Sequence, residues 1–528
     1  MEVKPAMKAI GYSYLNNHFN LLLPKLGVEV YQDPKCDTEK IINYGASKRK
    51  IIPGTRKIGD SPYHHMVAAI KYQGIRLHFF ASIFKHVNEK ELAEFISAKP
   101  NAAYNRVIWH LYEWLTGSKL PLSDLSTGNY INLFDDQFYY TLENGERDKR
   151  TRVINNAIGT KDFCPTVRKT PQILELAKVN VYDTAYSKMQ SIGNKLTADI
   201  IGRSINYLYT KETKSSTEIE KETPSNQKMQ RFLNTIRNAG LFELTKEKII
   251  DIQNQIVEES KKSDDYRKEE IYVGTTIQRL GGIDEDVHYI GPLANHVESM
   301  MNGLLETHDK LMIDAKIPSL IHATLISFGE VYIHPLIDGN GRTHRYLIHD
   351  VMKQREPEHK FIIPISAAIL KNQTKYDQIL ESISRPIMAM LDWELDSENN
   401  NKVVIKNDID FMYRYPDYTD HVVFVYDMMN SAIAGELIEE ISLLLVFDSI
   451  KIEINKVADI PNNKLDTLVS ILIQGNGSIS KNKQKYALSL ISERVLSDIE
   501  TFSTEIIKGA QKRLNVDVTK VILSSQPS

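Results

Sequence analysis

The sequence predicts a mainly α-helical protein that carries one β-hairpin. Apolar residues recur three or four positions apart in several long stretches, which is the spacing that gives a helix one apolar face. Two of these stretches, residues 318–333 and 346–352, flank a short loop that contains glycine. Residues 272–279 and 287–290 instead read as two strands around a turn, and they predict the hairpin.

Composition limits the classes of protein to which the chain can belong. Its 528 residues suffice for roughly two to four domains, and 42% hydrophobic and 25% charged residues are ordinary for a globular protein. The net charge of −3 gives no reason to expect nucleic-acid or membrane binding. Because the chain has two cysteines, Cys36 and Cys164, and neither a signal-peptide pattern nor a long apolar run, the expected location is the cytoplasm.

The chain divides by pattern into three blocks. Residues 1–204 combine short mixed segments with helical stretches such as 183–206, and no motif in them indicates a chemistry. Residues 205–395 hold the patterns with chemical meaning, and the polar segment after them is expected to be a linker. Residues 403–528 are mostly helical by pattern, and docking or formation of a homodimer is the expected role of this block.

The loop between the two flanking helices is suited to binding an anion. The first helix is expected to end at His334, because Pro335 restricts the residue before it and lacks a backbone N–H donor. Gly339 and Gly341 allow the backbone to turn sharply and to approach a ligand closely. Because the loop opens onto the start of the second helix, its unpaired N–H groups are expected to bind phosphate oxygens.

Four side chains in and beside this loop indicate a reaction. Asp338 offers an oxygen ligand that suits Mg²⁺ shared with the phosphates of a substrate. Arg342 and Arg345 lie three residues apart on the second helix, so both guanidinium groups can face the same anion. His334 ordinarily titrates near neutral pH and can remove a proton from an attacking hydroxyl. The combination predicts an enzyme that binds a nucleoside triphosphate and transfers part of it.

Residues 334–345 resemble the signature of the Fic family, whose members mostly transfer AMP from ATP to protein hydroxyl groups. The family pattern, H-P-F-x-[DE]-G-N-G-R-x-x-R, is matched at every charged position and at both glycines. Leu336 stands where phenylalanine is usual, so the loop is expected to be anchored differently while its chemistry is retained. The resemblance extends over residues 205–395 and implies a Fic-like helical bundle with a β-hairpin flap, flanked by the other two blocks.

The resemblance assigns a role to each residue of the motif. His334 would deprotonate a Tyr, Thr or Ser hydroxyl of a target protein, or of the enzyme itself. Asp338 would bind Mg²⁺ between the α- and β-phosphates of ATP. The other motif residues would bind the phosphates, the first three through the loop and the last two through guanidinium groups: Gly339, Asn340, Gly341, Arg342 and Arg345. The protein would then be an ATP- and Mg²⁺-dependent protein adenylyltransferase.

A polar segment at about 210–222 resembles the inhibitory helix of many Fic proteins, which has the pattern [ST]-x-x-x-E-[GN]. Ser216 and Glu220 fit its first five positions, whereas Lys221 departs from the usual Gly or Asn. A Glu220 carboxylate paired with Arg345 would keep ATP from binding productively. In some relatives the same glutamate serves removal of AMP, so reversal is an open alternative. An ordinary solvated helix end is the other alternative for this segment.

Two further features receive roles through the resemblance. The predicted hairpin would be the flap that aligns the target's backbone by strand addition, with Thr276, Ile277 and Gln278 as docking residues. An ordinary surface hairpin is the alternative. Tyr376 would stack near the adenine, and packing in the protein interior is the alternative for this side chain.

Three other functions stay open at this point. Two His-Asp pairs, at residues 308–309 and 349–350, are of the kind found in HD-type metal-dependent phosphohydrolases, but that function leaves the glycine loop and its arginines without a role. A non-catalytic module that senses nucleotide would need neither the histidine nor the aspartate of the loop. Transfer of another nucleotide or of a phosphate group is the third alternative, since the sequence does not reveal which residues contact the nucleoside.

Overall fold

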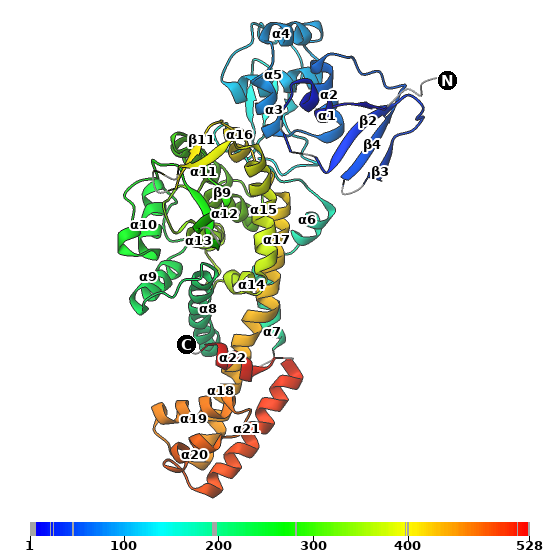
Figure 1. The fold of residues 1–528 in the computed structure, drawn as a ribbon. Helices are drawn as coiled ribbons and strands as arrows, with labels where there is room; N and C mark the ends of the chain where they lie inside the picture. The colour runs from blue at the N-terminus through cyan, green and yellow to red at the C-terminus, as the bar shows by residue number, and fades with distance from the viewer. Residues whose placement is uncertain are drawn as a thin grey trace, which may run out of the picture.

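The computed structural model of the chain is elongated and mainly α-helical, with a few small β-sheets (Figure 1). It describes residues 7–21, 23–24, 26–44, 47–192, 198–279, 282–396, 398, 401–514 and 516–525. An N-terminal unit lies at one end, a helical unit from the last part of the chain lies at the other, and a helical bundle lies between them. The predicted fold class is confirmed.

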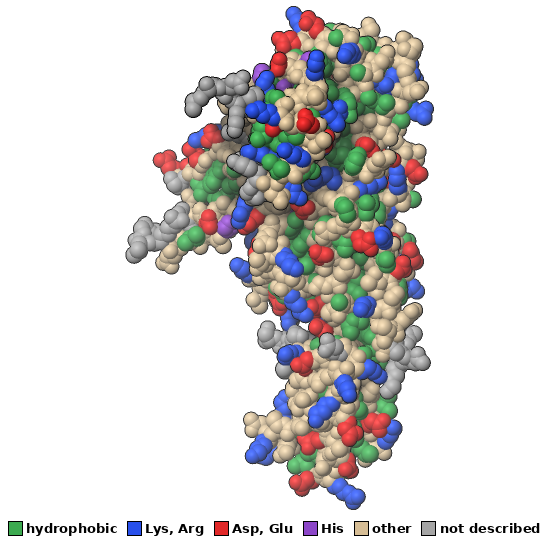
Figure 2. Space-filling model, turned by 90° about the vertical axis from the view of Figure 1, so that its right-hand side faces the viewer, with side chains coloured by type: hydrophobic (Ala, Val, Ile, Leu, Met, Phe, Trp, Pro, Cys, Tyr) green, Lys and Arg blue, Asp and Glu red, His purple; other side chains and the backbone are tan. Residues whose placement is uncertain are grey.

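The N-terminal unit packs helices against a mixed four-stranded sheet. Its elements are β1 (Lys8–Ala9), α1 (Tyr12–His18), β2 (Val28–Asp33), β3 (Lys40–Tyr44), β4 (Ser47–Pro53), α2 (Pro62–Gln73), α3 (Leu77–Phe84), α4 (Glu89–Ala98), α5 (Ala103–Thr116), β5 (Ile131–Asn132), β6 (Glu146–Asp148) and β7 (Val153–Asn155). The chain continues through α6 (Pro171–Leu176) and α7 (Val181–Ser191), which pack against α17 (Thr419–Ala432) beside the central bundle. The first sheet has the order β1-β2-β4-β3 with β2 and β4 parallel, and β5, β7 and β6 form a second sheet. Lys and Arg side chains are spread over the surface of this unit (Figure 2).

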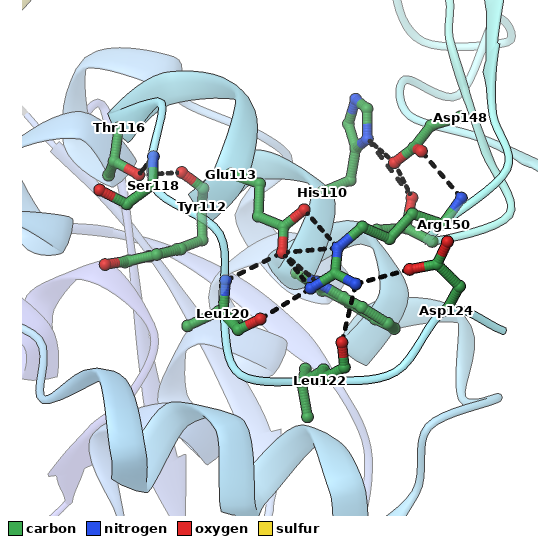
Figure 3. A network of polar contacts seen from close by, with 12 residues as sticks. His110, Tyr112, Glu113, Thr116, Ser118, Leu120, Leu122, Asp124, Asp148 and Arg150 are labelled. Atoms are coloured by element: carbon green, nitrogen blue, oxygen red, sulfur yellow. Dashed lines mark hydrogen bonds and ion pairs between the residues drawn. The ribbon is translucent and has the colours of Figure 1, made fainter.

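A network of polar contacts fastens α5 to the chain around β6 and β7 (Figure 3). The Arg150 guanidinium forms an ion pair with Glu113 of α5, with Nε 2.9 Å from Oε2. On the same helix, Nδ1 of His110 lies 3.0 Å from Oδ2 of Asp148, which also accepts a 2.6 Å hydrogen bond from the Thr151 hydroxyl. Burial raises the pKa of Asp148, but the hydrogen bonds from His110 and Thr151 outweigh it and lower that pKa. The network therefore ties α5 to this part of the chain through the Arg150–Glu113 ion pair and the ionised Asp148 carboxylate.

The central bundle contains the segment that the sequence singles out. Its elements are α8 (Ala198–Ile219), α9 (Asn226–Arg237), α10 (Lys246–Ile256), a short 3₁₀ turn (Glu259–Lys261), β8 (Tyr272–Arg279), β9 (Gly282–Ile290), α11 (Ala294–Met312), α12 (Ser319–Ile333), α13 (Asn340–Arg355), α14 (Ile365–Lys371), α15 (Gln373–Met390), β10 (Trp393–Asp396) and β11 (Lys402–Ile405). Helices α12 and α13 pack side by side through the apolar core. Strands β8 and β9 pair antiparallel, so the predicted hairpin is confirmed.

The last part of the chain is helical, and from the middle of α18 (Ile438–Val457) onward it has a core of its own, whereas the helices before that point belong to the main core. Its elements are α16 (Asp410–Arg414), α17 (Thr419–Ala432), a π-helical turn (Ile433–Leu437), α18 (Ile438–Val457), α19 (Asn462–Gln474), α20 (Lys481–Leu488), α21 (Glu493–Leu514) and α22 (Val518–Ser525). Helix α17 packs on α12, whereas the second half of α18 packs with the helices after it. None of the helices described here combines the length and apolar character that crossing a bilayer requires.

Some element boundaries differ from those that the pattern predicts. The helical stretch predicted at 183–206 contains the end of α7, at Ser191, and α8, which is described from Ala198; residues 193–197 lie outside the described residues. Helix α8 also runs across the predicted boundary between residues 204 and 205. The helical spacing of the sequence continues past residue 191, because apolar periodicity alone does not fix where a helix ends.

Candidate active site

The loop that joins α12 to α13 has a left-handed backbone conformation at both ends. His334 follows α12 in the left-handed conformation, with φ 52° and ψ 58°, and Gly339 precedes α13 with φ 86°. Glycine adopts such angles freely, whereas a residue with a side chain pays about 1–2 kcal/mol for the left-handed form. Strain at a non-glycine residue is common at functional sites, where the surrounding structure holds the residue in place.

The side chain of Asn340 holds this loop together from inside. Its Nδ2 donates to the Leu336 carbonyl at 2.8 Å, and its Oδ1 accepts from the Leu336 N–H at 3.1 Å. Asn340 is buried, so its side chain is used by the protein, and a phosphate could reach only its backbone N–H. The Leu336 side chain, which stands in place of the usual phenylalanine, is fully buried and anchors the loop in the core.

A residue that the sequence analysis missed, Arg267, fixes the loop from outside. This guanidinium is buried, and its Nε donates to the His334 carbonyl at 2.8 Å while Nη2 donates to the Pro292 carbonyl at 2.6 Å. The Arg267 backbone N–H also donates to the Pro335 carbonyl at 2.8 Å. Arg267 thus satisfies main-chain acceptors at the end of α12, where a helix leaves carbonyl groups unpaired.

His334 has one ring nitrogen fixed and the other free to accept a proton. Its Nδ1 lies 3.0 Å from the Val331 carbonyl oxygen, and because a carbonyl can only accept, Nδ1 must carry the hydrogen. Nε2 then presents a lone pair. Burial is the main cause that lowers the pKa of His334 from 6.5 to about 4, so the imidazole is neutral near pH 7. This tautomer and charge state are those of a general base.

Asp338 is an ionised carboxylate at the start of the glycine segment. Its Oδ1 accepts from the Gly339 N–H at 2.6 Å, and its Oδ2 lies 2.5 Å from Nζ of Lys261. Burial raises the pKa of Asp338, but Lys261 and Arg342 outweigh burial and lower it. A partly exposed, ionised carboxylate that already attracts a cation fits the predicted Mg²⁺ ligand.

Both arginines of the motif are buried and each is paired with the segment that follows α8. Arg345 Nη2 lies 2.7 Å from Glu220 Oε1, and Arg345 also bonds the hydroxyl and the carbonyl of Ser216 at 2.9 and 2.6 Å. Arg342 Nη1 lies 2.8 Å from Oε2 of Glu222, a residue that the inhibitory pattern does not select. Burial lowers the pKa of Arg345, but Glu220 outweighs burial and raises it. The structure therefore brings Ser216 and Glu220 onto Arg345.

The turn after α8 explains why Lys221 departs from the pattern without disrupting it. Lys221 has φ 56°, the left-handed conformation for which Gly and Asn are the usual residues. Its N–H donates to the Glu218 carbonyl at 2.9 Å, and the Glu222 N–H reaches the Thr217 carbonyl at 3.4 Å. These two bonds form a Schellman motif, which ends the helix. Lys221 thus takes the expected conformation at an energetic cost.

The Glu220 carboxylate also lies directly against the glycine loop. A Cβ atom added at Gly341 would come within 2.4 Å of Glu220 Oε1. Any side chain at this position would therefore displace the carboxylate. The contact places Glu220 against Gly341 near the start of α13, the region that is predicted to bind phosphate.

Helix α8 is held in place by buried polar contacts that sequence reasoning missed. The Glu212 carboxylate accepts from the Ser366 N–H at 2.9 Å and lies 3.0 Å from Nε2 of His349. On the other side, Lys211 forms ion pairs with α18, including one of 3.2 Å to Glu440. No short pattern marks these residues, because their partners lie far along the chain. They fix the helix that carries Ser216.

The base of the hairpin lies beside His334, and the predicted docking residues lie further along β8. The ring of Tyr289, on β9, is 6.3 Å from that of His334 between centroids. Thr276 and Gln278 are exposed and Ile277 is half-buried. Within the described residues, β8 pairs with β9 along one edge, so its other edge is open to a further strand. The arrangement suits strand addition next to the histidine.

Tyr376 lies in a packed position rather than on an open surface. It is 5% exposed, and its ring stacks between those of His344 and Phe424, at 6.2 and 6.0 Å between centroids. Arg345 is close enough for its charge to oppose the rise in the Tyr376 pKa that burial causes. The geometry favours the packing alternative, in which Tyr376 supports the arginine from behind, over stacking on an adenine.

The two His-Asp pairs do not form a metal centre in the described part of the chain. His308 bonds His322, with 3.1 Å between ring nitrogens, and Asp350 accepts the Gly240 N–H at 2.8 Å. Among the described residues, the group of metal-type ligands that lie close together belongs to neither pair, and it consists of Glu356, Glu358 and His359. His308, His349 and Asp350 therefore serve internal polar contacts, and Asp309 is exposed.

Comparison with known proteins identifies the same part of the chain. Residues 243–352 match the model of the Fic/DOC family. A Fic family protein from Desulfovibrio desulfuricans G20 has 16% identity and a TM-score of 0.32, over 62% of this chain and 87% of that one. A Fic domain containing signaling protein from Bacteroides thetaiotaomicron VPI-5482 has 16% identity and a TM-score of 0.31, over 48% and 97%. No curated protein matches the chain.

Proposed function

Because this chain carries a Fic/DOC family domain at residues 243–352, we propose that it is a protein adenylyltransferase, which transfers AMP from ATP to a Tyr, Thr or Ser hydroxyl of a target protein. The observation that carries the proposal is the state of His334. Its Nδ1–H is bonded to a main-chain carbonyl, its Nε2 is free, and its pKa near 4 leaves it neutral. A neutral imidazole beside a phosphate-binding loop is suited to activating a hydroxyl.

The proposed step is an in-line displacement at the α-phosphorus of ATP. The target hydroxyl oxygen attacks this phosphorus while its proton passes to Nε2 of His334. A bond forms between that oxygen and the α-phosphorus, the bond to the oxygen that bridges the α- and β-phosphates breaks, and pyrophosphate leaves. A positioned base contributes roughly 10²–10⁴ in rate, and positioning with charge neutralisation supplies most of the remainder.

Phosphate binding falls to the loop backbone and to the two arginines. The N–H groups of Gly339, Asn340 and Gly341 lie at the start of α13, where the helix dipole favours negative charge. Arg342 and Arg345 extend from the same helix, and their burial strengthens any bond to a phosphate oxygen. Asp338 is the residue that would hold Mg²⁺, which when bound neutralises charge on the phosphates. Lys261, now paired with Asp338, would have to move aside.

We propose that the enzyme is held inactive by Glu220. The carboxylate occupies Arg345 and lies against Gly341, so a triphosphate in the loop would meet a negative charge and one arginine fewer. About a third of the Glu220 side chain is exposed, whereas the Arg345 side chain is 1% exposed. The ion pair is therefore expected to be stronger than a surface pair and weaker than a fully buried one. Whether the same carboxylate also serves removal of AMP is an extension of this proposal.

The pH dependence of transfer follows from the state of His334. Since burial lowers its pKa from 6.5 to about 4, the neutral, active form should persist as the pH falls, and activity should be lost only near pH 4. In a Glu220→Gly protein the pKa of His334 should not rise, because the charge of Glu220 is among the causes that raise this pKa. Initial rates of label transfer measured from about pH 8 downward should therefore stay level to about pH 5. A rate that halves near 6.5 would show an exposed histidine instead.

The proposal is tested with ATP that is labelled either on the α-phosphate or on the γ-phosphate. A Glu220→Gly protein with Mg²⁺ should become labelled from α-labelled ATP and stay unlabelled from γ-labelled ATP, because pyrophosphate leaves. Mass spectrometry should find one AMP on a hydroxyl side chain, including those of the enzyme itself. Incorporation of label from γ-labelled ATP would support phosphate transfer instead of AMP transfer. If the protein is modified only when another nucleotide is supplied, that nucleotide and not ATP is the donor. If no nucleotide modifies the protein or a target, the transferase proposal fails.

A further inference from the structure

The segment after α8 places a second carboxylate, that of Glu222, on Arg342, one of the two arginines proposed to bind phosphate. Oε2 of Glu222 lies 2.8 Å from Nη1 of Arg342 and 2.7 Å from Nζ of Lys228. The side chains of Arg342 and Lys228 are 2% and 6% exposed, whereas that of Glu222 is 30% exposed. The two cations are therefore largely removed from water, and an ion pair in such a position restrains its members more than a surface pair does.

The left-handed turn is what allows both carboxylates to face α13. In a continuing helix, residues 220 and 222 would point about 200° apart around the axis, so they could not reach the same neighbour. Lys221, with φ 56°, ends the helix and reverses the direction of the chain between them. As a result Glu220 contacts Arg345 and Glu222 contacts Arg342. The two arginines lie about one turn apart on α13.

Glu222 competes for a group that the proposed substrate needs. Arg342 is shared between Glu222 and Asp338, with its Nη2 3.3 Å from Asp338 Oδ1. A phosphate oxygen that binds this guanidinium must displace Glu222 or share the arginine with it. Sharing is unfavourable, because a carboxylate and a phosphate repel each other at such short distances. Removal of Glu220 alone would leave this obstacle in place.

We propose that Glu222 is a second inhibitory carboxylate, which withholds Arg342 from the nucleotide as Glu220 withholds Arg345. The inference rests on the proposed function, because it takes both arginines to be phosphate ligands. The two contacts also indicate which segment must move before a nucleotide can bind both arginines. Glu212 and Ser216 fix α8 through buried contacts, so the turn at residues 220–222 moves while the helix stays. The enzyme is released by displacement of a turn that carries two carboxylates.

The test measures nucleotide binding with Glu222→Gln, a change that keeps the shape of the side chain and removes its charge. A non-hydrolysable ATP analogue with Mg²⁺ is titrated by calorimetry into the unmodified protein, into Glu222→Gln and into the control Glu218→Gln. Glu218 is exposed and belongs to the same segment, and its ion pair, 3.9 Å long, is with Lys214. We expect affinity about three- to tenfold higher for Glu222→Gln. We expect no change for Glu218→Gln.

Two further variants keep the result interpretable. Glu222→Ala removes a residual hydrogen bond that glutamine could make to Arg342, and thermal melting checks that each variant is folded. Glu220→Gly with Glu222→Gln should transfer label faster than Glu220→Gly alone. Affinity of both Glu222 variants equal to or below that of the unmodified protein would overturn the inference, even if Glu220→Gly is active. Tighter binding without transfer in any variant would uphold the second carboxylate and reject the transferase.

Discussion

Replacement of His334 by asparagine is expected to lower AMP transfer about 10²–10⁴-fold and to leave nucleotide binding unchanged. The loss follows from the free Nε2, which is the proposed acceptor of the hydroxyl proton. Nucleotide binding should persist because the loop backbone and the arginines that would bind phosphate are untouched. Asparagine is preferred to alanine, because residue 334 has φ 52° and asparagine tolerates the left-handed conformation best after glycine.

This loss is best measured in a protein that already carries Glu220→Gly, so that the starting rate is high. Label incorporation gives the transfer rate, and calorimetry with a non-hydrolysable ATP analogue gives the affinity. His64→Asn is a matched control, since His64 is an exposed histidine on α2 of the N-terminal unit. If transfer continues at the rate of the Glu220→Gly parent, His334 is not the base that accepts the hydroxyl proton.

Replacement of Glu220 by glycine is expected to raise label incorporation from α-labelled ATP about tenfold or more. A charge-assisted hydrogen bond contributes about 1.5–3 kcal/mol, and partial exposure of this carboxylate reduces that value. The change should be tolerated by the fold, because α8 ends at Ile219 and residue 220 lies in the turn. The change also clears the space over Gly341 that the carboxylate now fills.

The control for this gain is Glu218→Gln, which changes a neighbouring exposed carboxylate that pairs with Lys214. It should incorporate label as slowly as the unmodified protein does. If Glu220→Gly binds the ATP analogue and yet incorporates no more label than the control, the Arg345 contact is structural and the inhibitory role is wrong.

Local patterns in the sequence were sufficient to predict the fold class and the shape of the loop. The apolar spacing over 318–333 predicts α12, observed as Ser319–Ile333, because one buried face recurs with each helical turn. The alternating segments at 272–279 and 287–290 predict the hairpin for a similar local reason, and the second strand, β9, is longer than predicted, at Gly282–Ile290. Ser216 and Glu220, predicted four residues apart on one face of a helix, both lie against Arg345. The roles of these residues stay predictions.

Residues whose partners lie far along the chain could not be predicted. Arg267 and Lys261 contact the loop from more than sixty residues away, and Glu212 reaches Ser366 across the bundle. The inhibitory pattern does not select Glu222, because the residue four positions before it is Glu218 and not Ser or Thr. A signal for it does exist: Lys221 occupies a position that calls for the left-handed conformation, and such a turn brings the next residue back over the helix.

The account depends most on where the triphosphate of ATP binds. A crystal structure of the Glu220→Gly protein with Mg²⁺ and a non-hydrolysable ATP analogue tests this directly. We predict phosphate oxygens on the N–H groups of Gly339–Gly341 and on both arginines, the metal on Asp338, and Nε2 of His334 facing the α-phosphate. A triphosphate bound elsewhere, or a His334 ring turned away from it into the protein interior, would contradict the account.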